Sequence, residues 1–100
     1  MIKEIILTPI AEKNYEDIIA FIIKKWGLKT TNNFILRFEK VCDLLAGNPE
    51  IYPFINKTKK IQKCVLTKHN VIYFREYEDT IKILTIFDTR QNPDKLSPII

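Results

Sequence analysis

The strongest constraint on the fold is a change in the spacing of apolar residues near Pro53. Before that residue, apolar side chains recur every three or four positions, which is the spacing of one face of a helix. After it, three short runs rich in β-branched residues indicate strands. A chain of 100 residues in which helical spacing is followed by a group of three strands predicts an α+β domain of two layers.

A strand followed by a first helix is predicted at the start of the chain. The strand covers residues 2–7 and stops at Thr8, which can cap a helix whose first residue is Pro9. Gly27 gives this helix a place to end. The predicted buried stripe of the helix consists of Ala11, Tyr15, Ile18, Ile19, Ile22, Ile23 and Trp26.

A second helix is indicated by a stripe that runs from Phe34 to Leu45 and stops at Gly47 and Pro49. Its start can be capped by Thr30, Thr31 or Asn32. The aromatic residues at these spacings are expected in the core.

Three strands are predicted in the second half, over residues 61–67, 71–77 and 80–88. The breaks between them are short enough for hairpin turns, so the strands should form an antiparallel meander. Two helices stacked on one face of that sheet complete the two layers. Residues 48–60 are expected to form one long connection, and residues 1–100 a single domain.

The net charge of +4 lies in the second half, because the first half balances its basic and acidic residues. A stretch without any carboxylate carries five lysines, namely Lys57, Lys59, Lys60, Lys63 and Lys68. Such a block attracts phosphate or an acidic protein segment. It is equally consistent with a solvated loop and strand edge.

Several classes of protein are not expected. No apolar run approaches the roughly 20 residues that cross a bilayer, so we expect a cytoplasmic protein. Cys42 and Cys64 are far apart and have no second Cys or His beside them at metal-ligand spacing. We expect two small buried side chains, no disulfide, no metal and no cofactor.

Three phrases of the sequence resemble one known family. They are TPIAEKNYEDIIAFI at the first helix, LLAGNPEIYP after the second, and HNVIYFREYEDTIKILTIFDTRQNP across the last two strands. With the order strand, helix, helix and three strands, they resemble the RelE/ParE superfamily of toxins, also known as plasmid stabilisation proteins. The resemblance implies the RelE-like two-layer fold, a toxin of a type II toxin–antitoxin system, and an antitoxin that wraps it with an otherwise disordered segment.

The resemblance leaves two mechanisms open. RelE-like members cut messenger RNA on the ribosome, whereas ParE-like members act on DNA gyrase. Cleavage needs a base for the 2′-hydroxyl, cations for the phosphate and an acid for the leaving oxygen. Lys63 and Arg90 match a lysine and an arginine of the ribonucleases. Asn70, Ile61 and Leu96 replace an arginine, a lysine and a tyrosine of that set.

Each candidate residue also has a structural interpretation. Lys63 is equally consistent with an exposed lysine on an edge strand, and Arg90 with an ion pair to Asp88 or Asp94. His69 is expected as a solvated turn residue. We therefore favour a ParE-like toxin that binds its target noncatalytically. A ribosome-dependent RNase and a nontoxic basic module that holds nucleic acid are the alternatives, and Lys57, Lys59, Lys60 and Lys68 are candidates for target or antitoxin binding.

Overall fold

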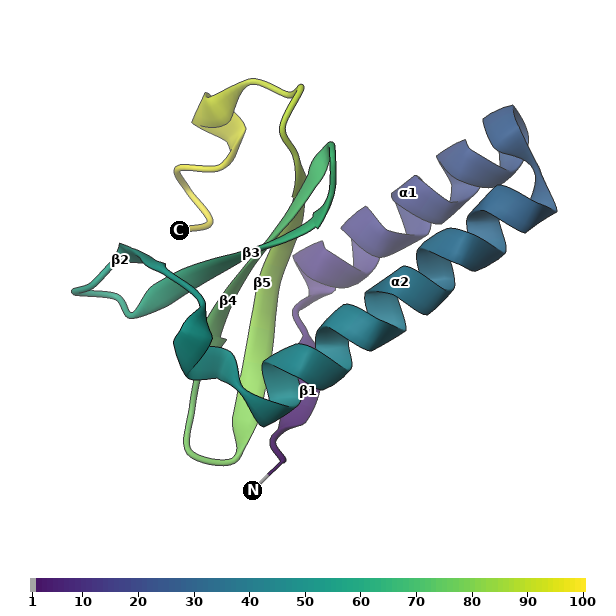
Figure 1. Ribbon diagram of the computed structural model, residues 1–100. Helices are drawn as coiled ribbons and strands as arrows, with labels where there is room; N and C mark the ends of the chain where they lie inside the picture. The colour runs from purple at the N-terminus through teal and green to yellow at the C-terminus, as the bar shows by residue number, and fades with distance from the viewer. Residues whose placement is uncertain (1) are drawn as a thin grey trace.

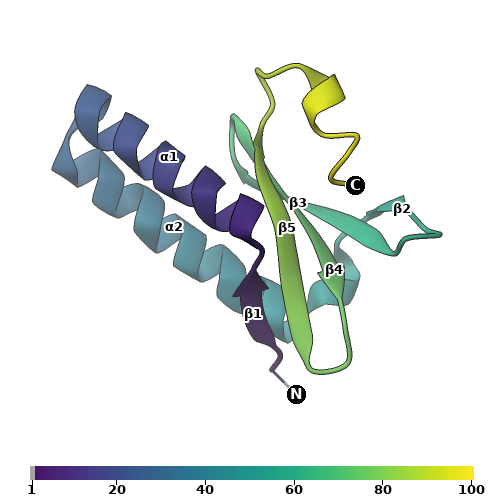
Figure 2. The same cartoon turned by 180° about the vertical axis from the view of Figure 1, so that it is seen from behind.

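The computed structural model describes residues 2–100 and has two layers, a helical hairpin and a five-stranded sheet (Figure 1). Seen from behind, the two helices lie side by side along one face of the sheet (Figure 2). The elements are β1 (Glu4–Leu7), α1 (Pro9–Trp26), α2 (Leu28–Gly47), the 3-10 helix η1 (Pro49–Ile51), β2 (Phe54–Asn56), β3 (Ile61–Thr67), β4 (Asn70–Glu76), β5 (Thr80–Asp88) and the 3-10 helix η2 (Pro93–Lys95). The predicted α+β fold is confirmed.

The last long strand, β5, lies inside the sheet, because the strand order is β1-β5-β4-β3-β2. β1 pairs with β5 in parallel, from Glu4 opposite Thr80 to Leu7 opposite Ile83. The other neighbours are antiparallel, so β3, β4 and β5 form the predicted meander.

Side chains from the start of α1 attach this helix to β5. Thr8 caps the helix as predicted, since its Oγ1 accepts a hydrogen bond from the Ala11 N–H at 3.1 Å and donates one to the Leu84 carbonyl at 2.8 Å. Asn14 Oδ1 accepts from Thr85 Oγ1 at 2.7 Å and from the Ile86 N–H at 3.1 Å. Beyond the end of β1, a side chain of α1 therefore supplies the hydrogen-bond partner that a backbone N–H on the uncovered edge of β5 would otherwise lack.

Thr8→Ala should destabilise the protein by about 1–2 kcal/mol, because it removes the cap and the bond to the Leu84 carbonyl together. Urea unfolding followed by circular dichroism measures the loss. Thr8→Ser is the control, since it keeps the oxygen and should stay within about 0.5 kcal/mol of the parent. A Thr8→Ala variant as stable as the parent would contradict the role of the cap.

The connection between the helices is a single residue, Gly27. Its φ of +86° lies in the left-handed region that glycine adopts without strain, and its N–H bonds to the carbonyls of Ile22 and Ile23. α2 therefore begins at Leu28, and the prediction that Thr30, Thr31 or Asn32 caps it was wrong. Thr31 lies inside the first turn, where its hydroxyl donates to the Gly27 carbonyl at 2.9 Å.

The predicted connection 48–60 contains two short elements, η1 and β2. β2 pairs Phe54 with Gln62 and Asn56 with Ile61, and the Lys63 N–H donates to the Pro53 carbonyl at 3.1 Å. β2 is thus the outermost strand, and the interpretation of Lys63 as a residue of an edge strand was wrong. Three residues without alternation of apolar and polar side chains leave no strand pattern to detect.

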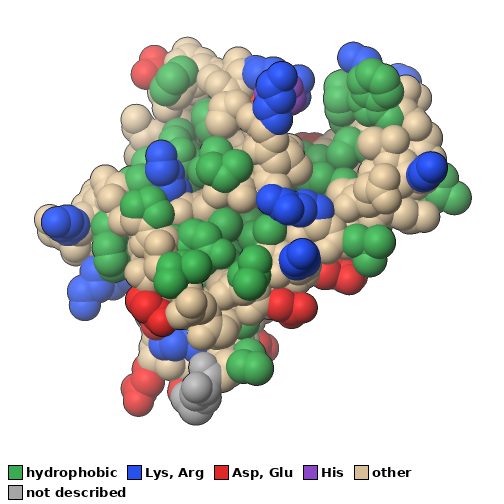
Figure 3. All heavy atoms as spheres, in the orientation of Figure 1, with side chains coloured by type: hydrophobic (Ala, Val, Ile, Leu, Met, Phe, Trp, Pro, Cys, Tyr) green, Lys and Arg blue, Asp and Glu red, His purple; other side chains and the backbone are tan. Residues whose placement is uncertain are grey.

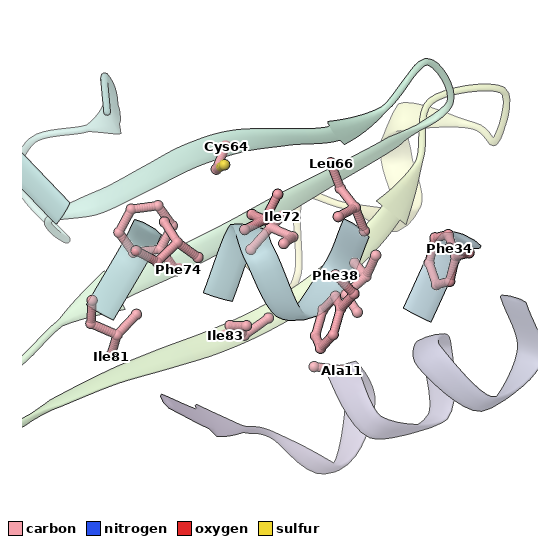
Figure 4. Close-up of a cluster of buried hydrophobic side chains, with 12 residues drawn as sticks. Ala11, Phe34, Phe38, Cys64, Leu66, Ile72, Phe74, Ile81 and Ile83 are labelled. Atoms are coloured by element: carbon pink, nitrogen blue, oxygen red, sulfur yellow. The ribbon is translucent and has the colours of Figure 1, made fainter. Parts of the chain in front are cut away.

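The core lies between the helices and the sheet (Figure 4). It consists of Ala11, Phe34, Phe38, Val41, Leu45, Cys64, Leu66, Ile72, Phe74, Ile81, Ile83 and Ile86. Ile23 and Trp26, the last residues of the predicted buried stripe of α1, are instead 47% and 62% exposed. Both residues lie in the last turn of α1, and the tip of the hairpin extends away from the sheet (Figure 1).

Both cysteines are free. Cys64 is buried, and Cys42 is partly buried on α2. Burial raises the pKa of the Cys42 thiol to about 12 and raises that of Cys64 as well. Both thiols therefore stay neutral and weakly nucleophilic at neutral pH.

Candidate functional site

A cleft of about 670 Å³ opens between the tip of the helical hairpin and the nearby end of the sheet. In Figure 3 it is the hollow between the hydrophobic cluster at the upper right and a basic cluster beside the only histidine, His69. α1 and α2 supply one wall, and the β3–β4 turn with the end of β5 supplies the other. Such a volume is typical of ligand and peptide sites.

The wall from the helices has an apolar floor, and charged residues such as Asp17, Lys25 and Arg37 also line it. Ile18, Ile22 and Phe34 line it, and the rings of Phe21 and Trp26 stand at its rim with 51% and 62% exposure. Lys25 Nζ lies 5.4 Å from the centroid of the Phe21 ring and 5.5 Å from that of Trp26, within the range of a cation–π contact. Exposed aromatic side chains grouped at a concave rim are typical of a surface that binds a protein partner.

The wall from the sheet is polar and centres on Asp88, which ends β5 opposite Asn70. Asp88 Oδ1 accepts from the backbone N–H and from Nε of Arg90 at 2.9 and 3.0 Å, and Oδ2 accepts from Nη2 at 2.8 Å. The Arg90 guanidinium lowers the pKa of the Asp88 carboxyl below its ordinary value. The predicted ion pair of Arg90 is confirmed, with Asp88 as its partner.

The β3–β4 turn is held to the end of β5 by its backbone. The Thr89 N–H donates to the His69 carbonyl at 2.9 Å. Thr67 Oγ1 accepts from the His69 N–H at 3.3 Å and donates to Asn70 Oδ1 at 2.9 Å. His69 lies in the turn as predicted, but it is half-buried and lines the cleft.

Two cations of the cleft make no ion pair within residues 2–100, namely Lys25 and Arg37. Both carboxylates that line the cleft form ion pairs, Asp17 with Lys13 at 2.9 Å and Asp88 with Arg90. Arg37 is oriented by a bond from its Nε to the Leu66 carbonyl at 3.1 Å. The cleft therefore combines an apolar floor with unpaired positive charge at its rim.

Lys63 and Arg90 are not brought together. Lys63 is exposed in the middle of β3 opposite Tyr73, whereas Arg90 follows β5 and lines the cleft. On β4, Tyr73 lies opposite Lys63, whereas Asn70 lies opposite Asp88, two residues before Arg90. Tyr73 and Asn70 are three residues apart, which is about 10 Å along a strand. Burial raises the pKa of the Tyr73 hydroxyl, which keeps it protonated.

The other positions that depart from the ribonuclease pattern have structural roles. Ile61 is 4% exposed, and Leu96 is half-buried, where it accepts backbone hydrogen bonds from Ile99 and Ile100. Asn70 is buried at the start of β4. None of these three side chains can exchange a proton at neutral pH.

The lysine block is divided by β3. Lys57, Lys59 and Lys60 are exposed before this strand, and Lys68 is exposed in the turn after it. A seven-residue strand spans about 20 Å, which exceeds the Debye length at physiological salt. Lys57, Lys59 and Lys60 are therefore separate from Lys68 as sources of positive charge, with Lys63 between them on β3, and only Lys68 adjoins the cleft.

Phe21, Lys25 and Arg37 were missed by the sequence analysis. Phe21 lies off the buried stripe of α1, and this departure from the apolar spacing is a signal of an exposed aromatic residue. For Lys25 and Arg37 there is no such signal, because solvated helix faces carry cations routinely.

Within residues 2–100, no group of three His, Cys, Asp or Glu residues is placed to hold a metal ion. In the same range, no helix has both the length and the apolar character that crossing a membrane requires.

Comparisons with known proteins connect this fold to one family. The family model described as the ParE toxin of the type II toxin–antitoxin system parDE matches residues 5–93. A chain in the solved structure of the chromosomal ParDE TA system from P. aeruginosa has a TM-score of 0.72 and 13% identity, over 87% of this chain and 96% of that chain. No curated protein matches. The family match spans most of the sequence, and the chain belongs to the ParE toxin family of type II toxin–antitoxin systems.

Proposed function

We propose that the chain inhibits bacterial growth by binding a macromolecular target, and that a cognate antitoxin neutralises it by occupying the cleft. The observation that carries the proposal is the family match over residues 5–93. The resemblance to the ParE branch makes DNA gyrase the first target to test. One continuous core supports the proposal that residues 1–100 act as a single domain.

Binding is favoured over RNA cleavage by the arrangement of the cations. An RNase needs its cations around one phosphate, since stabilisation of the developing charge is the main source of its rate. Lys63 lies in the middle of a strand, and the Arg90 guanidinium already holds Asp88. Arginine stays protonated and cannot act as a base. Lys63 is the one residue of the set that could exchange a proton, and it lies apart from Arg90.

The cleft supports an antitoxin segment of defined chemistry. Its apolar floor favours apolar anchors, and the unpaired charges of Lys25 and Arg37 favour Asp or Glu beside those anchors. Lys68 adds positive charge next to the cleft and would increase the association rate. A disordered segment that folds on binding can cover both walls at once.

The test is induced expression in a bacterial host, with separate readouts of DNA breaks and of transcript cleavage. We expect growth arrest with DNA breaks and without site-specific transcript cuts. Coexpression of the small gene next to this one should relieve the arrest. Normal growth at confirmed soluble expression would argue for the nontoxic basic module.

Lys63→Ala and Arg90→Ala separate the two mechanisms. For a toxin that binds its target, we expect both variants to stay toxic, because binding energy comes mainly from buried aromatic and aliphatic anchors. In an RNase, each loss would cost about 3 kcal/mol, or roughly a hundredfold in rate. Two folded, nontoxic variants of a parent that cuts transcripts would establish the RNase instead.

A further inference from the structure

A second hollow lies at the other end of the sheet. It encloses about 400 Å³ next to the turn before β3 and the end of β4. Phe54, Lys60, Gln62, Arg75 and Tyr77 are among the residues that line it. None of these residues lines the cleft between the hairpin and β5, so the two hollows can bind different partners.

Two lining residues each carry a buried polar atom that has no hydrogen-bond partner within residues 2–100. One is Gln62 Oε1, in a side chain that is 1% exposed and whose Nε2 donates to the carbonyls of Pro49 and Tyr52. The other is Arg75 Nε. An unpaired buried donor or acceptor costs free energy, and a native structure that retains one requires an explanation. Both atoms are covered by neighbouring groups, so a ligand that carries donors and acceptors satisfies this pair once the two side chains turn toward the hollow.

Aromatic rings and cations stand together at the mouth of this hollow. The Tyr77 ring is 40% exposed, with the Arg75 guanidinium 5.1 Å from its centroid and Lys82 Nζ at 5.5 Å. Phe54 is 48% exposed. Aromatic faces beside cations form the stacking platforms that bind the bases of single-stranded nucleic acid.

A second group of cations, separate from Arg75 and Lys82, lies on the side of this hollow formed by the turn before β3. Lys60 lines it, and Lys57 and Lys59 are exposed in the same turn. Asn56 Oδ1 accepts from the Lys59 N–H at 3.0 Å and orders this turn. On the other side, Glu76 is paired with Lys3 at 2.9 Å and Glu78 is exposed. A phosphate would therefore be held beside Lys60, away from the two glutamates.

From these observations we infer that the hollow binds a nucleobase that carries a phosphate. The base stacks on Tyr77, its polar edge bonds to Arg75 or Gln62, and its phosphate contacts Lys60. Nucleobases present donors and acceptors side by side on one edge, which matches the unpaired atoms. The base belongs either to a free nucleotide or to a single strand, and the inference does not depend on toxicity or on the antitoxin.

Fluorescence anisotropy of a labelled single-stranded octanucleotide, titrated with the purified full-length protein, tests the inference. We expect saturable binding that Tyr77→Leu weakens about tenfold, as expected for the loss of one stacked base. Arg75→Lys keeps the charge but removes the Nε donor, and should also weaken binding severalfold. Circular dichroism verifies that each variant is folded. Unlabelled nucleoside monophosphate displaces the strand if the hollow takes free nucleotides, and fails to displace it if a strand is required.

Lys60→Ser and Lys68→Ser form a matched pair, since each removes one exposed lysine from a turn next to β3, Lys60 before the strand and Lys68 after it. Lys60→Ser should reduce the salt dependence of binding by about 0.7 in the slope of log K against log salt, the effect of one phosphate contact with a single strand. Lys68→Ser should leave this slope unchanged. Three results would overturn the inference. They are equal effects of the two variants, displacement of the strand by poly-glutamate as effectively as by nucleic acid, and the absence of saturable binding at low salt.

Discussion

Replacing Phe21 and Trp26 together by serine should weaken antitoxin binding about a thousandfold. Aromatic anchors at the centre of an interface commonly contribute 2 kcal/mol or more each, and a loss of about 4 kcal/mol corresponds to that factor. Both side chains are at least half exposed in the free chain, so the fold should not change. Isothermal titration calorimetry with the protein encoded beside this chain measures the effect.

Leu36→Ser with Leu44→Ser is the matched control for this pair. These two apolar residues are 62% and 49% exposed on α2, and neither lines the cleft. The control should bind with nearly the parent affinity. Equal losses of affinity in the two double variants would show that the antitoxin does not bind in the cleft. An unchanged affinity in both variants would show the same.

Phe74→Ala should have the largest effect on stability, with a loss of about 3–5 kcal/mol. Phe74 is 0% exposed in β4, and its ring meets that of Tyr52 edge-on with 6.0 Å between centroids. The truncation leaves a cavity between the sheet and η1. Since a small domain is stable by only about 5–15 kcal/mol, much of the protein should unfold at moderate temperature.

Urea unfolding measures the loss for Phe74→Ala. Val65→Ala is the comparison, because Val65 lies on the adjacent strand β3 and is 60% exposed. It should change stability by less than about 0.5 kcal/mol. A loss below about 1.5 kcal/mol for Phe74→Ala would show that the surrounding side chains close the cavity.

Local patterns in the sequence predicted most of the elements. Thr8 followed by Pro9 marked the start of α1, and the alternation after Pro53 located β3, β4 and β5 within about one residue. These features depend on neighbouring residues alone. The order of these elements predicted the two layers, and the resemblance to the RelE/ParE superfamily implied the same arrangement. β2 was not predicted, because its three residues show no alternation of apolar and polar side chains. α2 begins earlier than predicted, because Gly27 alone makes the turn between the helices.

The cleft could not be predicted, because its two walls are far apart in the chain. Phe21 and Arg37 belong to the hairpin, whereas His69 and Arg90 belong to the sheet. Only the packing of the hairpin against the sheet brings these side chains together, and no spacing within the sequence encodes that geometry. The Asp88–Arg90 ion pair was predictable, since its partners are two residues apart.

The position of β5 between β1 and β4 determines when the sheet can be completed while the chain is being synthesised. β1 is made before both helices, yet its partner residues, Thr80–Ile83, are made only after β4. At about 5–20 residues per second, the first strand waits roughly 4–15 s for that partner. The polar wall of the cleft is completed later still, because Asp88 ends β5 and Arg90 follows it. The nascent chain therefore cannot form the complete cleft until Arg90 has been made, and a partner already present in the cell can meet the site as it forms.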